Sequence, residues 1–389
     1  MIPGLYVIDG WKTQFWHAVI PWVGDHILQL NDPITVFPGG SGDTTYNYVE
    51  VLVFFVIAII SAMIWSVIDR KKRDYQRLNY WFIVIVRYYV ASFMLSYGLS
   101  KVFLLQFGEP GFYQLLRPLG QMSPMGLAWT FIGFSPAYTI FSGLAEVIGG
   151  LLLLHRRTKY IGALIVIAVM TNVMALNYFY DVPVKLFSTQ LWVMAVVIAW
   201  PKLKQLWYVL ADVKATQPKT FFSPFIGTKW YKPSLVFKVL FVLYMIIAPG
   251  IRNYERFTAS GEKPPMYGLY EVKTHTINGV EKPALLTDSE RWRYIAMEYA
   301  GSAQVYGMDL KTTYYQTKVD TVAQTIALNR WNDTTNVHTL TYIKNEKGFL
   351  FKGDLEGKNI EVQTQYLTKK DFPIMSRGYH WIQEYPFNR

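Results

Sequence analysis

The chain has 389 residues, of which 52% are hydrophobic and 17% aromatic, with a formal net charge of +11 and no cysteine. That hydrophobic share exceeds what ordinary soluble domains carry, and the lack of cysteine excludes disulfides, thiolate metal sites and iron–sulfur clusters. The positive charge is divided among short segments between apolar runs, which argues against a nucleic-acid-binding face and favours loops that set membrane topology.

Ahead of the first long apolar run, residues 1–48 carry aromatic side chains near helical spacing beside charged ones. This stretch is too polar to cross a bilayer, so we expect it to lie along the extracytoplasmic membrane surface. The run at 49–68 is long enough to cross a hydrocarbon core of about 30 Å. It ends in the basic stretch DRKKRDYQR, which we expect to stay in the cytoplasm.

Five further apolar segments follow, separated by short connections. Basic residues at 155–159 and 201–204 stand at the ends of two of them, whereas the loop at 108–124 has few charges, so the spans alternate in direction. An even number of spans places both termini on the same side, which we expect to be periplasmic. The predicted transmembrane helices lie near 49–68, 79–105, 137–154, 160–178, 187–200 and 235–250.

After residue 255 the hydrophobic period changes to two, and turn sequences such as NDTTN and LEGK separate the segments. About eight short strands predict a small periplasmic barrel or sandwich over 255–389. The predicted fold class is therefore an α-helical polytopic membrane bundle with about six spans, plus a C-terminal all-β domain. The candidate strands lie at 292–299, 303–308, 312–318, 323–329, 338–343, 348–354 and 359–366.

Ionisable side chains inside a spanning segment are costly, about 2.5–3.5 kcal/mol each on insertion scales, so each is a candidate functional group. Arg87 and Lys101 share one face of the second span with small residues, and Glu146 lies among glycines in the third. Counted from the helix ends, Arg87 and Glu146 lie at similar depth, so we expect them to form an ion pair. The pair would serve a substrate or a proton, or would only orient two helices, and the sequence favours neither.

The fourth span adds Asn172 and Asn177, and Asp181 and Lys185 follow around Pro183 at the outer membrane boundary. These residues could form the lip of a polar pocket, or the asparagines could serve as hydrogen-bonding groups between helices. The spans hold no paired histidines, and the sequence has no zinc, Walker or Rossmann motif. We therefore predict no metal site and no nucleotide cofactor.

Several of these residues occur in longer motifs. Arg87 with GLSK at 98–101, GLAEVIGG at 143–150 and NYFYDVPVK at 177–185 resemble the DoxX-like integral membrane protein family over roughly residues 79–200. The C-terminal RGYHWIQEYPFNR resembles the ending of long DoxX-like proteins from Bacteroidota. The resemblance implies a four-helix core in a bacterial cytoplasmic (inner) membrane, and some family members are linked to quinone-dependent oxidation of sulfur compounds.

Two functions stay open on these observations. In the first, the protein binds a quinone or another lipid-soluble substrate in a redox-linked role. Arg87 or Lys101 would then bind a carbonyl oxygen and Glu146 would carry protons. In the second, it is a non-catalytic subunit that anchors the β domain to membrane or periplasmic protein partners. A transporter ranks below both, because no two similar halves with interrupted helices are evident.

Overall fold

The computed structural model describes residues 5–37, 42–70, 74–211, 225, 227–260, 263–333 and 335–385. Residues 71–73 of the first basic stretch and 386–389 of the C-terminal motif lie outside these described residues. The chain divides into two compact units. The helical unit comprises Met1–Gln106, Ser123–Trp129 and Ala137–Asn253, and the barrel unit comprises Phe107–Met122, Thr130–Pro136 and Tyr254–Arg389.

Six described helices are long and apolar enough to cross a membrane, and each overlaps one of the predicted spans, although α3 ends three residues before the predicted end at 105. The predicted fold class, a polytopic helical bundle with a β domain, is thereby confirmed. Two of the helices run well past their predicted ends, through Pro201 and Pro249. The six are α2 (Thr45–Ile68), α3 (Gln76–Val102), α6 (Pro136–Leu154), α7 (Lys159–Phe179), α8 (Lys185–Leu210) and α9 (Tyr231–Ser260).

Shorter helices precede and connect these spans. The N-terminal helix α1 (Leu5–His26) packs on the start of α2 through a small apolar cluster that includes Ile20, Tyr46 and Val49. Two connecting helices, α4 (Phe112–Leu116) and α5 (Pro124–Phe134), occupy the segment between α3 and α6 that the sequence suggests to be a loop. The membrane-surface position expected for residues 1–48 stays a prediction.

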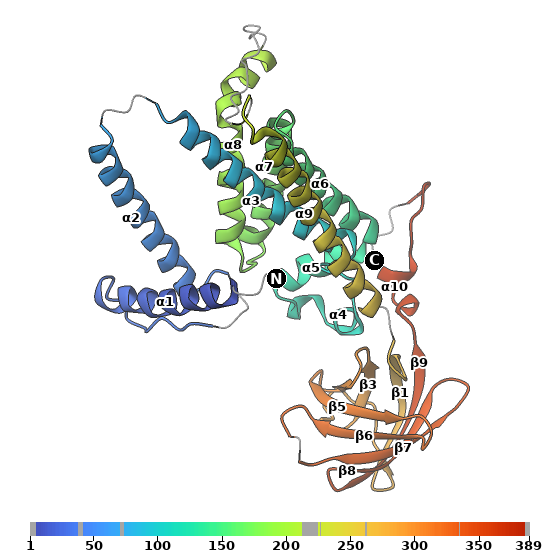
Figure 1. Cartoon of the computed structure of the whole chain (residues 1–389). Helices are drawn as coiled ribbons and strands as arrows, with labels where there is room; N and C mark the ends of the chain where they lie inside the picture. Colours follow the sequence, from blue (N-terminus) through green and yellow to red (C-terminus); the bar gives the residue numbers. More distant parts are fainter. Residues whose placement is uncertain are drawn as a thin grey trace. The chain divides into compact units, whose positions relative to one another are not determined.

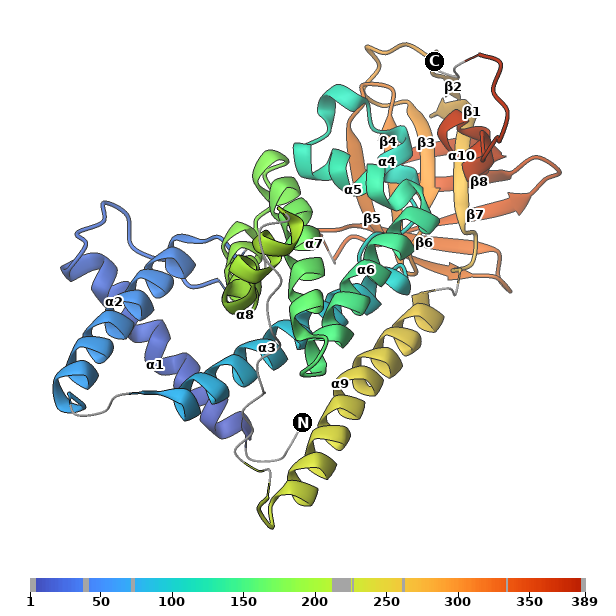
Figure 2. The ribbon, with the colours of Figure 1, turned by 90° about the horizontal axis from the view of Figure 1, so that it is seen from above.

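Helices α3, α6, α7 and α8 lie side by side and enclose the main apolar core of the helical unit (Figures 1 and 2). Glycines bring these helices close together. A β-carbon added at Gly149 of α6 would lie 2.9 Å from Val166 of α7, and one at Gly162 of α7 would lie 2.7 Å from the backbone nitrogen of Leu153. Small residues at such crossings are a common means of packing helices in lipid.

The barrel unit is built from antiparallel strands joined in chain order. Eight of them close into a barrel, because β1 pairs with β9 as well as with β3, and this closure decides between the two predicted alternatives (Figure 1). The short β2 extends β1 only. The bounds are β1 (Gly268–Ile277), β2 (Val280–Glu281), β3 (Trp292–Met297), β4 (Ser302–Gly307), β5 (Thr312–Asp320), β6 (Thr325–Arg330), β7 (His338–Lys344), β8 (Phe349–Leu355) and β9 (Lys358–Leu367).

Alternate residues of each strand fill the barrel interior with aliphatic and aromatic side chains. A histidine is buried near this core: His275 of β1 accepts a hydrogen bond at Nδ1 from the backbone nitrogen of Trp292, at 3.0 Å. Its Nε2 has no hydrogen-bond partner among the described residues. Burial, together with the nearby Arg291 guanidinium, lowers the pKa of His275 to about 4. The imidazole is therefore neutral at pH 7.

Most of the connection that follows α3, namely Phe107–Met122 and Thr130–Pro136, belongs to the barrel unit. Phe112, at the start of α4, is buried in a cluster with Leu269 of β1 and Ala296 of β3. The carboxylate of Glu298 accepts hydrogen bonds from the backbone nitrogen of Phe112, at 3.1 and 3.3 Å. Lys369, after β9, approaches Glu298 at 3.8 Å. A segment between two spans is thus part of the barrel's own packing.

Candidate functional site

Helices α3 and α6 approach each other closely at a pair of glycines. A β-carbon added at Gly98 would lie 2.8 Å from the carbonyl oxygen of Gly143, and one added at Gly143 would lie 2.8 Å from Cβ of Lys101. The two glycines let the helix backbones nearly touch. This proximity brings the polar side chains that follow each glycine within reach of one another.

Lys101 of α3 and Glu146 of α6 form a buried ion pair, in which the lysine Nζ donates to Oε1 of the glutamate. Their side chains are 7% and 2% exposed. The second carboxylate oxygen, Oε2, is buried without a hydrogen-bond partner among the described residues. Thr139 and Gly143 lie seven and three residues before Glu146 on the same buried helix face. The site thus combines a cation with an acceptor oxygen that still has bonding capacity.

The predicted ion pair between Arg87 and Glu146 is wrong. A β-carbon added at Gly150 of α6 would lie 3.1 Å from Cβ of Met94 of α3. The two helices run in opposite directions, so four residues further along α6, at its end, Leu154 lies near the level of Val90. Helix α3 continues for roughly four more turns beyond that level. Counting depth from helix ends therefore misplaced Arg87, which lies about 21 Å along α3 from Lys101 at 1.5 Å per residue.

The two asparagines of α7 differ from each other. Asn177 is buried, and its side-chain amide donates to the carbonyl oxygen of Val184 at 3.5 Å, so it ties the end of α7 to the segment before α8. Asn172 is exposed, so the prediction that it belongs to a buried polar site is wrong. A polar side chain on the outer face of a span contributes nothing to an internal pocket.

Asp181 and Lys185 do come together, as an i, i+4 pair at 2.8 Å where the turn after α7 meets the start of α8. The Asp181 side chain is 82% exposed, and its φ of +51° marks a tight turn. Both residues were predicted at a pocket lip, but the structure places Asp181 on the surface, whereas the Lys185 side chain is only 20% exposed. An ion pair with so exposed a partner contributes little to stability.

Sequence reasoning missed Asp43. Its carboxylate accepts hydrogen bonds from the backbone nitrogens of Lys185, at 2.7 Å, and Leu186, at 2.9 Å, and it lies 3.8 Å from the Lys185 ammonium. It therefore caps the first turn of α8 from a segment that precedes α2. An acidic residue just before a span is a weak signal, and nothing local indicates a partner 142 residues away.

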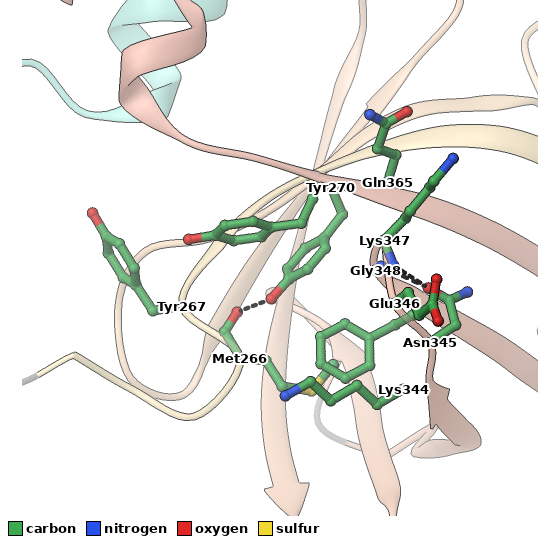
Figure 3. A pocket seen from close by; sticks show the side chains of 11 residues that line it. Met266, Tyr267, Tyr270, Lys344, Asn345, Glu346, Lys347, Gly348 and Gln365 are labelled. Atoms are coloured by element: carbon green, nitrogen blue, oxygen red, sulfur yellow. Dashed lines mark hydrogen bonds between the residues drawn. The ribbon is translucent and has the colours of Figure 1, made fainter.

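The barrel unit has a separate open hollow of about 640 Å³ (Figure 3). Tyr270 points into it and donates from its hydroxyl to the carbonyl oxygen of Met266 at 2.8 Å. Burial raises the pKa of Tyr270 well above its ordinary value, so the phenol stays protonated. Lys344 and Lys347 line the other side, on the turn between β7 and β8. The hollow presents aromatic faces and ammonium groups, and its lining pairs no base with a nucleophile.

Within the described ranges, no three histidine or carboxylate side chains gather closely enough to hold a metal ion. The Lys101–Glu146 pair is thus the strongest candidate for chemistry: it is buried, charged and incompletely hydrogen-bonded. It can bind a polar group that offers both a hydrogen-bond acceptor and a donor.

Comparison with known proteins gives one similar protein. The chain is 35% identical over 116 residues to the uncharacterised protein YwoB of Bacillus subtilis strain 168, a match that covers 29% of this chain and 72% of that protein. No family model and no solved structure matches the chain. At this identity, and with most of the relative's length covered, the chain belongs to the family of YwoB.

Proposed function

We propose that this protein is a DoxX-like protein of the bacterial inner membrane that binds a quinone, or another lipid-soluble carbonyl compound, at the Lys101–Glu146 pair. The observation that carries the proposal is the buried Oε2 of Glu146, which has no hydrogen-bond partner among the described residues. A buried acceptor without a donor is costly, and a ligand hydroxyl would satisfy it. The motifs at 98–101 and 143–150 supply the family resemblance.

The two side chains have complementary roles in this proposal. The Lys101 ammonium donates to a carbonyl oxygen of the ligand, and Glu146 accepts a proton from, or returns it to, the hydroxyl of the reduced form. Arg87 no longer takes part, because it lies about four turns away along α3. The chain contains no cysteine and so no thiol-based redox centre, and the electrons must come from a separate donor.

The proposed location follows from the charges at the span ends. Basic segments at 69–73, 155–159 and 201–204 stand at alternate connections, as expected for cytoplasmic loops. With six spans, we propose that both termini and the barrel lie in the periplasm. A tag or protease site placed in the β7–β8 turn and exposed to external protease in intact spheroplasts would test this orientation.

The binding proposal is tested with the full-length protein in a neutral detergent. Removing only one member of a buried ion pair strands the other, so the informative variant is the double change Lys101→Met with Glu146→Gln. Its matched control is Lys352→Met with Glu361→Gln, which removes an ion pair whose side chains are 46% and 48% exposed. We expect organic extracts of the wild type and of the control to contain about one quinone per chain by mass spectrometry.

The double variant at the buried pair should retain none and should show no tryptophan quenching on titration with a short-chain menaquinone. Near-ultraviolet circular dichroism establishes that each variant is folded. If the wild type neither carries a quinone nor responds to added menaquinone, the proposed function is wrong.

A non-catalytic role in a complex is the second candidate, and one surface favours it. The segment after α10 (Pro373–Ser376) exposes Tyr379, Trp381 and Tyr385, each with at least 80% of its surface accessible. Exposed aromatic side chains in one short segment are typical of a surface that docks on a partner. Chemical cross-linking in membranes should then map a partner to residues 379–385, and truncation after Ser376 should abolish the cross-link. Purification as a stable monomer with no cross-link would contradict this role.

A further inference from the structure

Arg87 is a buried cation that forms no ion pair with a described carboxylate. It is 5% exposed, although arginine seldom lies so deep without an acidic partner, and its Nε has no hydrogen-bond partner among the described residues. The guanidinium lies 5.2 Å from the ring centre of Tyr88, which is its aromatic neighbour. An aromatic ring compensates a buried charge only partly.

The charged neighbours of Arg87 are themselves cations. Lys159, at the start of α7, and Lys238 of α9 both interact electrostatically with Arg87, and Lys202 of α8 interacts with Lys159. The ring of Tyr160 lies 4.8 Å from Nζ of Lys159 and 5.9 Å from Nζ of Lys202. Four helices therefore contribute to a single cluster of positive charge, which we call the Arg87 cluster (Arg87, Lys159, Lys202 and Lys238).

No described carboxylate forms an ion pair with any member of the Arg87 cluster. The exposed His155, between α6 and α7, is affected by the same positive charges. Its pKa is lowered below the ordinary value, first by its limited burial and then by the nearby cations Lys238, Arg157, Arg156 and Arg87. Like charges at close range in a partly desolvated place repel strongly, so the arrangement calls for an anion that the chain does not supply.

The position of the cluster identifies the kind of anion. Arg87 lies beyond the level at which α6 ends, beside the α6–α7 connection, and Lys238 is seven residues into α9. Helix α9 packs next to this site, since the rings of Tyr88 and Phe241 are 5.7 Å apart. The charges of the α6–α7 connection predict that it lies at the cytoplasmic membrane surface, so we expect the neighbouring Arg87 cluster near the lipid headgroups, where basic pockets between spans bind acidic lipids. The planar guanidinium fits the oxygens of a phosphate group.

We propose that the Arg87 cluster binds the phosphate of an anionic lipid headgroup, which enters between α3, α7 and α9. The phosphate accepts hydrogen bonds from the guanidinium of Arg87 and from the ammonium groups of Lys159 and Lys238. The acyl chains lie along the lipid-exposed side of α9. This site is distinct from the Lys101–Glu146 pair and does not depend on the function proposed for it.

The test uses the full-length protein, stripped of lipid in a neutral detergent, with two variants of equal charge change. Arg87→Gln alters the buried cation, and Lys204→Gln alters an exposed lysine of α8 as the control. Native mass spectrometry and thermal unfolding are measured with phosphatidylglycerol, with phosphatidylcholine and with inorganic phosphate. We expect the wild type and Lys204→Gln to retain one phosphatidylglycerol in preference to phosphatidylcholine, and Arg87→Gln to bind it about tenfold more weakly or worse.

The outcomes separate the sources of the phosphate. Stabilisation by inorganic phosphate alone, with the same dependence on Arg87, would overturn the lipid as the source and leave a soluble phosphate site. Equal binding by Arg87→Gln and Lys204→Gln would overturn the site itself. Without any anion, Arg87→Gln should be at least as stable as the wild type, because it removes an uncompensated charge. If Arg87→Gln fails to fold, Lys238→Gln gives the same comparison.

Discussion

Gly98 of α3 and Gly143 of α6 are so close that a β-carbon on either would lie less than 3 Å from the carbonyl oxygen of the other. Each added β-carbon would also lie within about 3 Å of a second backbone atom, the nitrogen of Val147 or of Val102, and backbone cannot move aside as a flexible side chain would. The separation of these two helices, and with it the contact between Lys101 and Glu146, is therefore set by two residues that lack side chains.

Replacing Gly98 by alanine should push α3 and α6 apart. We expect a loss of about 1–3 kcal/mol in the free energy of unfolding, which is typical of overpacking at a tight contact. Gly250→Ala in α9 is the control, because no atom lies within 4 Å of its added β-carbon. Thermal unfolding in detergent should place the control at or slightly above the wild type. Equal stability of the two variants would contradict the close packing.

Because Lys101 and Glu146 form a buried ion pair, we expect the effects of replacing them on the free energy of unfolding to be strongly non-additive. Glu146→Gln alone leaves a buried ammonium group without its counter-charge and should cost about 3–5 kcal/mol. Lys101→Met alone strands the carboxylate and should cost a similar amount. The double variant should lie near the wild type, because neither charge is then buried. Equilibrium unfolding of all four proteins closes the cycle, and simple additivity would show that the side chains do not interact.

Because His275 is buried and neutral, we expect acid to lower the stability of the barrel. Its pKa falls from 6.5 in the unfolded chain to about 4 in the fold, so between these values the unfolded state binds the extra proton. Stability should be complete above about pH 6.5 and decrease as the pH falls toward 4, by roughly 3 kcal/mol in all. His275→Gln keeps an acceptor for the Trp292 nitrogen and removes the titration.

Thermal unfolding of the full chain between pH 4 and 7 therefore compares the wild type with His275→Gln. The midpoint of the wild type should fall more steeply with acid than that of the variant. Parallel curves would mean that another group controls the response to acid.

Because Phe112 is buried against the barrel strands, we expect the segment between α3 and α5 to stabilise the barrel. Phe112→Ala removes a large side chain that is 1% exposed against Leu269 and Ala296, and should cost about 3–5 kcal/mol. Leu119→Ala, in the same connection but 70% exposed, is the control and should change stability by less than about 0.5 kcal/mol. Limited proteolysis of the strands, followed by mass spectrometry, measures the difference. Equal protection of both variants would contradict a structural role for this segment.

Hydropathy alone was enough to predict the six spans, because a bilayer demands long apolar helices whatever their packing. The last seven strands were equally readable from their alternating pattern. The first barrel strand, β1, was not placed, although its inward residues alternate in the same way. Closure of the barrel depends on pairing between β1 and β9, which are about ninety residues apart, so sequence left barrel and sandwich as alternatives.

The candidate site was predictable as a set of residues but not as a set of contacts. Charged residues in apolar segments point to Arg87, Lys101 and Glu146 at once. Which two of them pair depends on how far one helix slides along the other, and the sequence of a single helix does not contain that offset. The role of Asp43 was missed for a related reason. A residue that caps a helix from a distant segment leaves no pattern in the sequence around that helix. The resemblance to DoxX-like proteins stays a prediction.

The chain passes between the two units five times, at 106–107, 122–123, 129–130, 136–137 and 253–254. A domain joined to its neighbour by one linker can be removed without exposing the neighbour's core. Removal of this barrel is different, because a chain ending at residue 255 would leave Phe112 without the apolar surface that covers it. A relative without the barrel should therefore carry a shorter or more polar connection after its α3 helix.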